Sequence, residues 1–352
     1  MIRNYVSTAV RQLARRKAYT ALNLAGFALG LACVVLIGLF VHHETGFDDH
    51  YRDAERIYRL SADFDPAKRR GMAYPAANVQ PAGPTLLAEL PGAIEQMARI
   101  GGQRVRLARG MQMYYEDRFR WADSSIFELF DFQWLRGDPK RALAAPASVV
   151  LTQSTAAKYF GAEDPVGQTL LLETTWPLTV TGVIADLPPD THLSASAIAS
   201  FETAFDLLNW NYETNWSYPG FHTYVRLRPG ARIEQVLDAL PEVIARHKRP
   251  VDDIVGMTAT PIADIHLFAN RELELTPAGD ARTVTTMAAI AVCILLIACA
   301  NFMNLATARA ATRAREVGMR KVLGATRAAL IVQFLGEALL VSAVAMLLAI
   351  PL

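Results

Sequence analysis

Three long apolar runs divide the chain, and two polar segments of unequal length separate them. About 20 residues of α-helix cross the apolar layer of a bilayer, and each run reaches roughly that length. We therefore predict transmembrane helices at 21–43, 284–306 and 328–352.

The longer polar segment, 44–283, has no apolar run that could span a membrane. Its hydrophobic positions change repeatedly between the period of a strand and that of a helix. The runs 56–60 and 221–227 are typical of strands, while 233–244 is the clearest amphipathic helix. This order of elements is compatible with an α+β or an α/β domain. We predict an α+β domain outside the membrane.

Basic residues concentrate in the shorter polar segment, 307–327, which we call the connector. They outnumber the single acid Glu316 and comprise Arg309, Arg313, Arg315, Arg320, Lys321 and Arg327. An excess of cations in a short loop indicates the cytoplasmic side, which places segment 44–283 outside and the N-terminus inside. Residues 1–20 combine helical spacing of apolar residues with basic ones, and this predicts an amphipathic helix on the inner membrane surface.

The connector has two interpretations. If it is helical, spacings of four, three and four residues place one charged set on a single face: Arg309, Arg313, Glu316 and Arg320. Gly324 would end this helix and Thr326 would cap the next one. One interpretation is a cationic anchor that contacts lipid phosphates. The other is a surface for a protein partner, which the position of Glu316 among the arginines favours.

Small and polar residues mark the predicted membrane helices. Gly26 and Gly30 form a pair typical of close helix packing, although such pairs also occur by chance in spans rich in alanine and glycine. Asn301 and Asn304 can bond to a neighbouring helix or to headgroups. An acid inside a membrane usually faces other helices, so we expect Glu337 in a packing role, with a proton relay as the less favoured alternative.

Composition and motifs restrict the chemistry. The 352 residues are 52% hydrophobic and 20% charged, with a formal net charge of +1, which is typical of a mixed membrane and soluble protein without attraction to nucleic acid. The chain contains no G-x-x-x-x-G-K-[ST], H-E-x-x-H or G-x-S-x-G motif. We therefore expect no catalytic residue, cofactor site or metal site. The cysteines all lie in apolar runs and imply no disulfide framework: Cys33, Cys293 and Cys299.

Two residue clusters receive a structural interpretation. The acids that follow the first helix lack the spacing of a calcium loop and are expected on a solvated face: Asp48, Asp49, Asp53 and Glu55. The late aromatic residues are expected in the core, with an exposed binding surface as the alternative: Trp210, Tyr212, Trp216, Tyr218 and Phe221.

The connector carries a family resemblance. Residues 301–325 read NFMNLATARAATRAREVGMRKVLGA and residues 333–340 read QFLGEALL. These words resemble the segment after the second membrane helix in MacB/FtsX-type ABC transporter permeases. The resemblance implies a cytoplasmic coupling helix that rests on a separate ATPase, with matching positions Arg315, Glu316, Gly318, Arg320, Lys321, Gly324 and Ala325. We therefore favour the partner surface, to which we also assign Arg309 and Arg313.

The outer segment resembles the periplasmic core domain of the same family. The similar words begin at Phe47, Asp123, Ser148, Thr179 and Ile262 and read FDDHYRDAERIYRL, DSSIFELFDFQWLRGDPKRAL, SVVLTQSTAAKYFGAEDPVGQTL, TVTGVIADLPPDTHL and IADIHLF. The resemblance implies a βα-repeat subdomain, formed by the first and last parts of the segment, with a second subdomain inserted at about 116–215.

The resemblance implies a permease subunit of the bacterial inner membrane that couples ATP hydrolysis on another chain to movement of the outer domain. Export of a drug, peptide or lipoprotein and control of envelope enzymes are both expected of such systems. The expected partners are an ABC-type ATPase that binds the ATP, a second permease half or second copy, and a periplasmic adaptor. A fourth helix is expected beyond residue 352, so the chain resembles a truncated unit. The alternative is a membrane-tethered sensor or adaptor with an outer ligand-binding domain.

Overall fold

The computed structural model describes residues 17–69, 71–208, 214–322 and 326–351. The chain separates into two compact units, one comprising Met1–His43 with Ala281–Leu352 and the other Glu44–Asp280. The second unit, which we call the outer domain, covers nearly the range 44–283. Most of the amphipathic helix predicted at 1–20 lies outside the described residues.

The first unit consists of α2 (Lys17–Thr45), α9 (Ala281–Val322) and α10 (Arg327–Ala349). Two stretches in it are long and apolar enough to cross a membrane, Leu24–Thr45 in α2 and Ala281–Asn304 in α9. The apolar stretch found in α10 is the shorter Ala338–Ala349. The described residues thus contain two of the three predicted spans, and the third stays a prediction.

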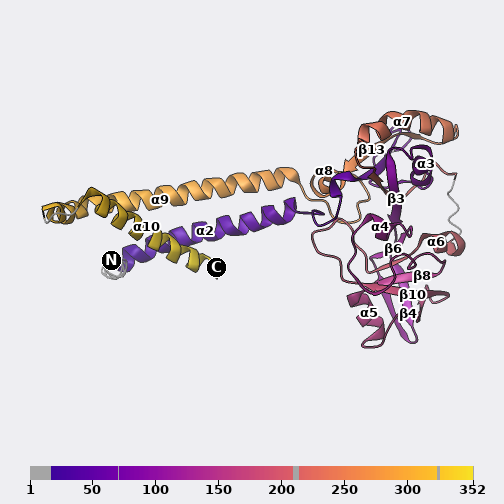
Figure 1. Ribbon diagram of the computed structural model, residues 1–352, viewed down its shortest axis with the longest axis horizontal. Coiled ribbons are helices and arrows are strands. Elements are labelled where there is room, and N and C mark those ends of the chain that lie inside the picture. The colour runs from indigo at the N-terminus through magenta and orange to yellow at the C-terminus, as the bar shows by residue number, and fades with distance from the viewer. Residues whose placement is uncertain (1–16, 70, 209–213, 323–325, 352) are drawn as a thin grey trace. The chain divides into compact units, whose positions relative to one another are not determined.

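Helix α9 does not end at the predicted limit of the second span, residue 306. It runs without a break from Ala281 to Val322, 42 residues in all, so the span and most of the connector form one helix (Figure 1). The sequence explains this continuity, because 281–322 contains no proline and its second half is rich in alanine and arginine, which favour helices. Thr326 directly precedes α10, and its carbonyl accepts a hydrogen bond from the Leu330 amide at 3.3 Å.

The outer domain is built on one mixed sheet, which has 13 strands in the part of the chain that the structure describes. These are β1 (Ile57–Phe64), β2 (Asn78–Val79), β3 (Ile94–Gly101), β4 (Val105–Arg109), β5 (Gln112–Glu116), β6 (Phe119–Ala122), β7 (Trp134–Gly137), β8 (Ser148–Thr152), β9 (Thr169–Leu172), β10 (Trp176–Ile184), β11 (Ala197–Ser200), β12 (Pro219–Leu227) and β13 (Ile254–Pro261). Their order is β13-β1-β12-β3-β6-β11-β8-β10-β9-β4-β5, with β2 on β12 and β7 on β10. Most neighbours are antiparallel, as an α+β fold requires.

One end of the sheet is a βα-repeat core. The chain runs β1, α3 (Ala82–Glu89) and β3, and much later β12, α7 (Ile233–His247) and β13, so each half reads strand, helix, strand. Figure 1 shows α3 and α7 together at this end. The predicted amphipathic helix is confirmed as α7, which buries Val236, Leu240, Val243 and Ile244.

The other end of the sheet is the insert, which comprises β4–β11 and carries α4 (Ile126–Leu129), α5 (Gln153–Phe160) and α6 (Phe201–Leu208). Thr152 caps α5 by accepting the Thr155 amide. The predicted start of the insert at residue 116 is wrong. The β4–β5 hairpin already belongs to the insert because β4 pairs with β9, placing Leu107 opposite Leu172. The insert therefore begins directly after β3.

The two faces of the sheet differ. One face carries Ile57, Ile100, Ile198 and Tyr224, and it is covered by loops that contribute Tyr51, Leu193, Ile262 and Ile265. We call it the junction face, because its covering loops include the segments that adjoin α2 and α9. The opposite face carries two apolar clusters, one under α3 and α7 and one under α5.

Last, α8 (Ile265–Phe268) lies among the loops that cover the junction face. The prediction of core aromatics is confirmed for Trp216 and Phe221, each only 2% exposed, whereas Tyr218 is half exposed. Trp210 and Tyr212 lie outside the described residues.

Candidate functional site

The predicted coupling residues lie along the inner part of α9. The helix contains Arg309, Arg313, Arg315, Glu316, Gly318, Arg320 and Lys321. Of these residues the structure describes the surroundings of Gly318 and Lys321, which are both exposed; the side chains of the others, and Gly324 entirely, lie outside the described part. The helical backbone keeps positions 309, 313, 316 and 320 along one face.

The predicted small-residue pair lies against α9. A side-chain carbon at Gly30 would meet the Ala298 methyl group at 3.0 Å, and one at Gly26 would meet the Asn301 amide nitrogen at 3.6 Å. The two helices run antiparallel, and the Phe27 and Phe302 rings pack 5.5 Å apart. Gly26, Gly30 and Asn301 therefore lie where α2 and α9 approach each other, and their packing role stays a prediction. Asn304 is exposed, and the Glu337 side chain is outside the described residues.

A buried polar group fixes the segment that follows α2. Asp48 has no exposed surface. Its Oδ1 accepts hydrogen bonds from the Thr191 hydroxyl at 2.6 Å and the His192 amide at 3.1 Å, and its Oδ2 lies 2.8 Å from Nδ1 of His192. Burial alone would raise the pKa of this carboxyl, but the His192 ring and these hydrogen bonds outweigh it and hold the pKa below its usual value.

His192 extends this group across the junction face. Its Nε2 lies 2.8 Å from the hydroxyl of Tyr224 on β12, and the Tyr51 hydroxyl lies 2.8 Å from that of Thr191. Burial raises the pKa of Tyr224 and of Tyr51, so both hydroxyls stay protonated and able to donate. Thr276, in the segment that leads to α9, donates to the His192 carbonyl at 3.3 Å. Segments that adjoin two different membrane helices are therefore tied to the same residue.

A second anchor lies beside the first. Nε2 of His266 lies 3.0 Å from a carboxylate oxygen of Glu44, and its ring stacks on Phe47 with centroids 3.5 Å apart. The Gly279 amide donates to the His266 carbonyl at 2.8 Å. A side chain at Gly279 would meet both Nε2 of His266 and Oε2 of Glu44 at 2.7 Å. A side chain at position 279 would therefore require these side chains to shift.

The junction face also holds a buried ion pair. Arg59 on β1 donates two hydrogen bonds to Glu274, at 2.5 and 2.8 Å, and the Arg59 side chain is 1% exposed. His222 on β12 bonds through Nε2 to the Leu273 carbonyl at 3.0 Å. Burial and the guanidinium of Arg59 lower the pKa of His222 to about 3. This ring is therefore neutral at physiological pH.

We call the set that ties these segments together the junction cluster: Glu44, Asp48, Arg59, Thr191, His192, His222, Tyr224, His266 and Glu274. Buried ionic hydrogen bonds have defined directions, so the cluster holds the segments before α9 and after α2 in one geometry. The sequence interpretation missed it. Asp48 was predicted on a solvated face and is buried instead, because its partners come from residues 191–192. The available signal was that Asp48, His192 and His266 each lie in a sequence segment that resembles the family.

The described residues hold no group of three or more His, Cys, Asp or Glu side chains that is arranged to bind a metal ion. The three cysteines are free thiols. His192 and His266 each pair with a carboxylate, and His222 bonds to the Leu273 carbonyl. These contacts join segments that are far apart in the sequence.

Comparisons with known proteins identify the family of the chain. The family model of the MacB-like periplasmic core domain matches residues 20–243, and that of the FtsX-like permease C-terminal matches residues 288–352. The macrolide export ATP-binding/permease protein MacB of Bdellovibrio bacteriovorus is 25% identical over 209 residues, 58% of this chain. The chain covers 30% of the length of that relative.

One solved structure shares the fold of the outer domain, and a second is similar at a lower score. A domain of a Porphyromonas gingivalis protein described as a permease has a TM-score of 0.51 and 19% identity, covering 68% of this chain and 99% of that domain. The periplasmic region of MacB from Actinobacillus actinomycetemcomitans has a TM-score of 0.46 and 15% identity, covering 60% of this chain and 91% of that region. Because the core-domain match alone takes in more than half of the 352 residues and the permease match follows it, this chain belongs to the MacB/FtsX-type ABC transporter permease family.

Proposed function

We propose that the chain couples ATP hydrolysis, performed by an ABC-type ATPase on another chain, to movement of the outer domain. The observation that carries this proposal is the continuity of α9 from Ala281, beside the outer domain, to Val322 in the connector. A helix without a break transmits displacement along its axis. The junction cluster supports the proposal at the outer end, because it ties the segments that adjoin α2 and α9 to the same part of the outer domain.

The connector offers the surface for the ATPase. Met319 and Val322 are 63% and 89% exposed at the end of α9, and exposed apolar residues among charged ones are common in protein interfaces. We place the connector in the cytoplasm and the outer domain in the periplasm, with the chain in the bacterial inner membrane and a third span at 328–352. A second copy or second permease half would complete the transporter, and a periplasmic adaptor is a further proposed partner. Export of a drug, peptide or lipoprotein and control of envelope enzymes are both proposed outcomes.

The first experiment measures ATPase binding and stimulated hydrolysis for Glu316→Ala, Arg320→Ala and Gly318→Leu in protein that inserts normally. If the connector docks on the ATPase, removing one partner of a desolvated pair costs about 2 to 5 kcal/mol, which weakens docking more than tenfold. Arg327→Ala is the matched control, because it removes an equal charge outside the positions that match the family.

The outcomes are distinct. If the connector is only a lipid anchor, Arg320→Ala and Arg327→Ala should have equal effects on ATPase binding and hydrolysis, and Glu316→Ala should have none. Wild-type binding and hydrolysis in all three variants would overturn the proposal. Co-purification with a sensor kinase in place of an ATPase would favour a sensor.

The proposed topology has its own test. In a background without native cysteines, an impermeant thiol reagent added to spheroplasts should label Asp190→Cys in the outer domain. It should leave Thr312→Cys in the connector unlabelled. The reverse labelling pattern would show that the connector is outside.

A further inference from the structure

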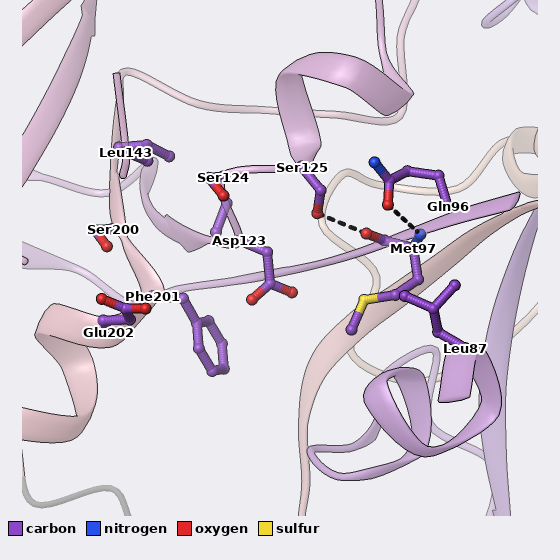
Figure 2. A pocket seen from close by; sticks show the side chains of 11 residues that line it. Leu87, Gln96, Met97, Asp123, Ser124, Ser125, Leu143, Ser200, Phe201 and Glu202 are labelled. Atoms are coloured by element: carbon purple, nitrogen blue, oxygen red, sulfur yellow. Dashed lines mark hydrogen bonds between the residues drawn. The ribbon is translucent and has the colours of Figure 1, made fainter. Parts of the chain in front are cut away.

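A cleft opens where the core meets the insert. Strands β3 and β6 pair at only two positions, Ile100 with Ala122 and Gly101 with Trp121. Beyond these two pairs, side chains that follow β6 bond to the backbone of β3. The Asp123 carboxylate accepts the Arg99 amide at 2.8 Å, and the Ser125 hydroxyl donates to the Met97 carbonyl at 2.6 Å. The cleft left between the diverging segments has a volume of about 220 Å³ (Figure 2).

The cleft lies at the carboxyl ends of two parallel strands. Strands β6 and β11 pair in parallel, with Ser200 opposite Ala122 at their last residues. Both residues line the cleft, and each strand leads from there toward a helix. In sheets with parallel strands, crevices outside the carboxyl ends are where ligands bind. The topology therefore favours a binding site at this position.

One wall of the cleft carries Asp123 and Gln96, which already bond to residues outside the cleft lining. Arg99 donates to both carboxylate oxygens of Asp123, at 2.8 and 2.9 Å, and its guanidinium lies 4.1 Å from the centroid of the Phe201 ring. The Gln96 amide donates to Glu128 at 2.7 Å. These contacts join the core to the insert and neutralise Asp123, which leaves this wall without an unused charge.

Other residues that line the cleft keep unused polar groups. Glu202 at the start of α6 is exposed, and among the described residues no cation lies within 4 Å of its carboxylate. Ser200 is 2% exposed, and no described residue bonds to its hydroxyl, which lines the cleft together with Ser124. Leu87, Met97 and Leu143 add apolar surface. The free groups are thus one anion, two hydroxyls and an apolar patch.

We propose that this cleft binds an ammonium group carried on a short apolar chain, with Glu202 as the counter-ion and Ser200 as a hydrogen-bond acceptor. The volume is below the roughly 300 to 1,000 Å³ of sites that enclose a drug-sized molecule. The occupant is therefore a small amine or the basic end of a longer molecule, such as a lysine side chain. The bound molecule would contact residues of both the core and the insert. The proposal does not depend on coupling to an ATPase, because binding is measured on this chain alone.

The test is a titration of the 352-residue chain in nanodiscs with n-butylammonium, in which saturation-transfer NMR measures binding. Binding should occur with n-butylammonium, and n-butanol and butyrate should bind much more weakly. Glu202→Gln should weaken binding about fivefold or more, which corresponds to about 1 kcal/mol, and Ser200→Ala should weaken it less. Glu242→Gln, an exposed acid on α7, is the matched control and should bind as the wild type does.

A second arm separates the two sources of the ligand. Nα-acetyl-lysine methylamide should bind if the natural occupant is the basic end of a peptide, whereas preference for n-butylammonium alone indicates a free amine. Equal binding of n-butanol, or equal affinities of the Glu202→Gln and Glu242→Gln variants, would overturn the proposal. Loss of ATPase coupling in the experiments above would not affect this result.

Discussion

The two faces of the outer-domain sheet are stabilised by different interactions. Under α7, Leu60, Val225 and Leu240 form an apolar cluster. On the junction face, Asp48 and Arg59 are as deeply buried but meet hydrogen-bonding partners. Apolar burial is non-directional, whereas ionic hydrogen bonds require a defined geometry. The apolar face gives the domain much of its stability, and the junction face fixes the two segments that begin and end the domain.

The largest expected effect is on the junction face. Removing one partner of a buried pair costs about 3 to 5 kcal/mol, and Asp48 also has a positive φ of 64° that alanine adopts poorly. Asp48→Ala should therefore reduce the free energy of unfolding, measured by denaturant titration, by at least that amount. Asp49→Ala, at the exposed neighbouring position, should change it by less than about 0.5 kcal/mol. Equal losses would contradict the distinct role of Asp48.

On the opposite face, Leu240→Ala should cost about 2 to 5 kcal/mol, because it leaves a cavity beneath α7. The comparison is sharpened by hydrogen exchange under native conditions. In Asp48→Ala the amides of His192 and Gly279 should exchange faster through local opening, whereas in Leu240→Ala they should exchange only through global unfolding. Faster local exchange in both variants would show that the two faces are not independent.

Acid should weaken the junction face through His222. The pKa of this ring is about 3 in the folded protein and 6.5 ordinarily, so as pH falls through 6.5 the unfolded chain takes up a proton that the folded chain does not. The free energy of unfolding should then fall by up to about 1.4 kcal/mol per pH unit between pH 6.5 and 3. His222→Leu should flatten this slope, as measured by unfolding at pH 7, 6 and 5. An unchanged slope would contradict the assignment.

The smallest effect is expected at an exposed pair. Arg136 and Asp164 approach to 2.6 Å, yet their side chains are 57% and 56% exposed. Arg136→Ala should change the free energy of unfolding by less than about 1 kcal/mol, and added salt should reduce even that difference. A larger loss would mean that directional ionic bonds stabilise the domain wherever they occur, which would remove the contrast between its faces.

Local patterns predicted much of this structure. Helix α7 follows from its apolar spacing, and strand β12 from the β-type run at 221–227. Each signal lies within one element, where the physical cause is local. The long apolar runs were equally direct, although only two of the expected spans are present in the described residues.

The rest depends on residues far apart in the chain. The burial of Asp48 requires Thr191 and His192, more than 140 positions away, and its own neighbours in the sequence resemble a solvated turn. The insert boundary depends on β4 pairing with β9, which no local pattern encodes. The cleft beside Glu202 exists because β3 and β6 diverge after two pairs. Single-sequence patterns do not determine such pairing.

If α9 couples an ATPase to the outer domain as we propose, its unbroken length makes it a lever arm. At 1.5 Å per residue its 42 residues extend roughly 63 Å, about twice the hydrocarbon thickness of a bilayer. A tilt of about 5° around one end would move the other end by roughly 5 Å over that length. The position of the pivot therefore sets the stroke at each end. The only glycine of this helix, Gly318, lies four residues from its inner end, so almost the whole arm can carry load without bending.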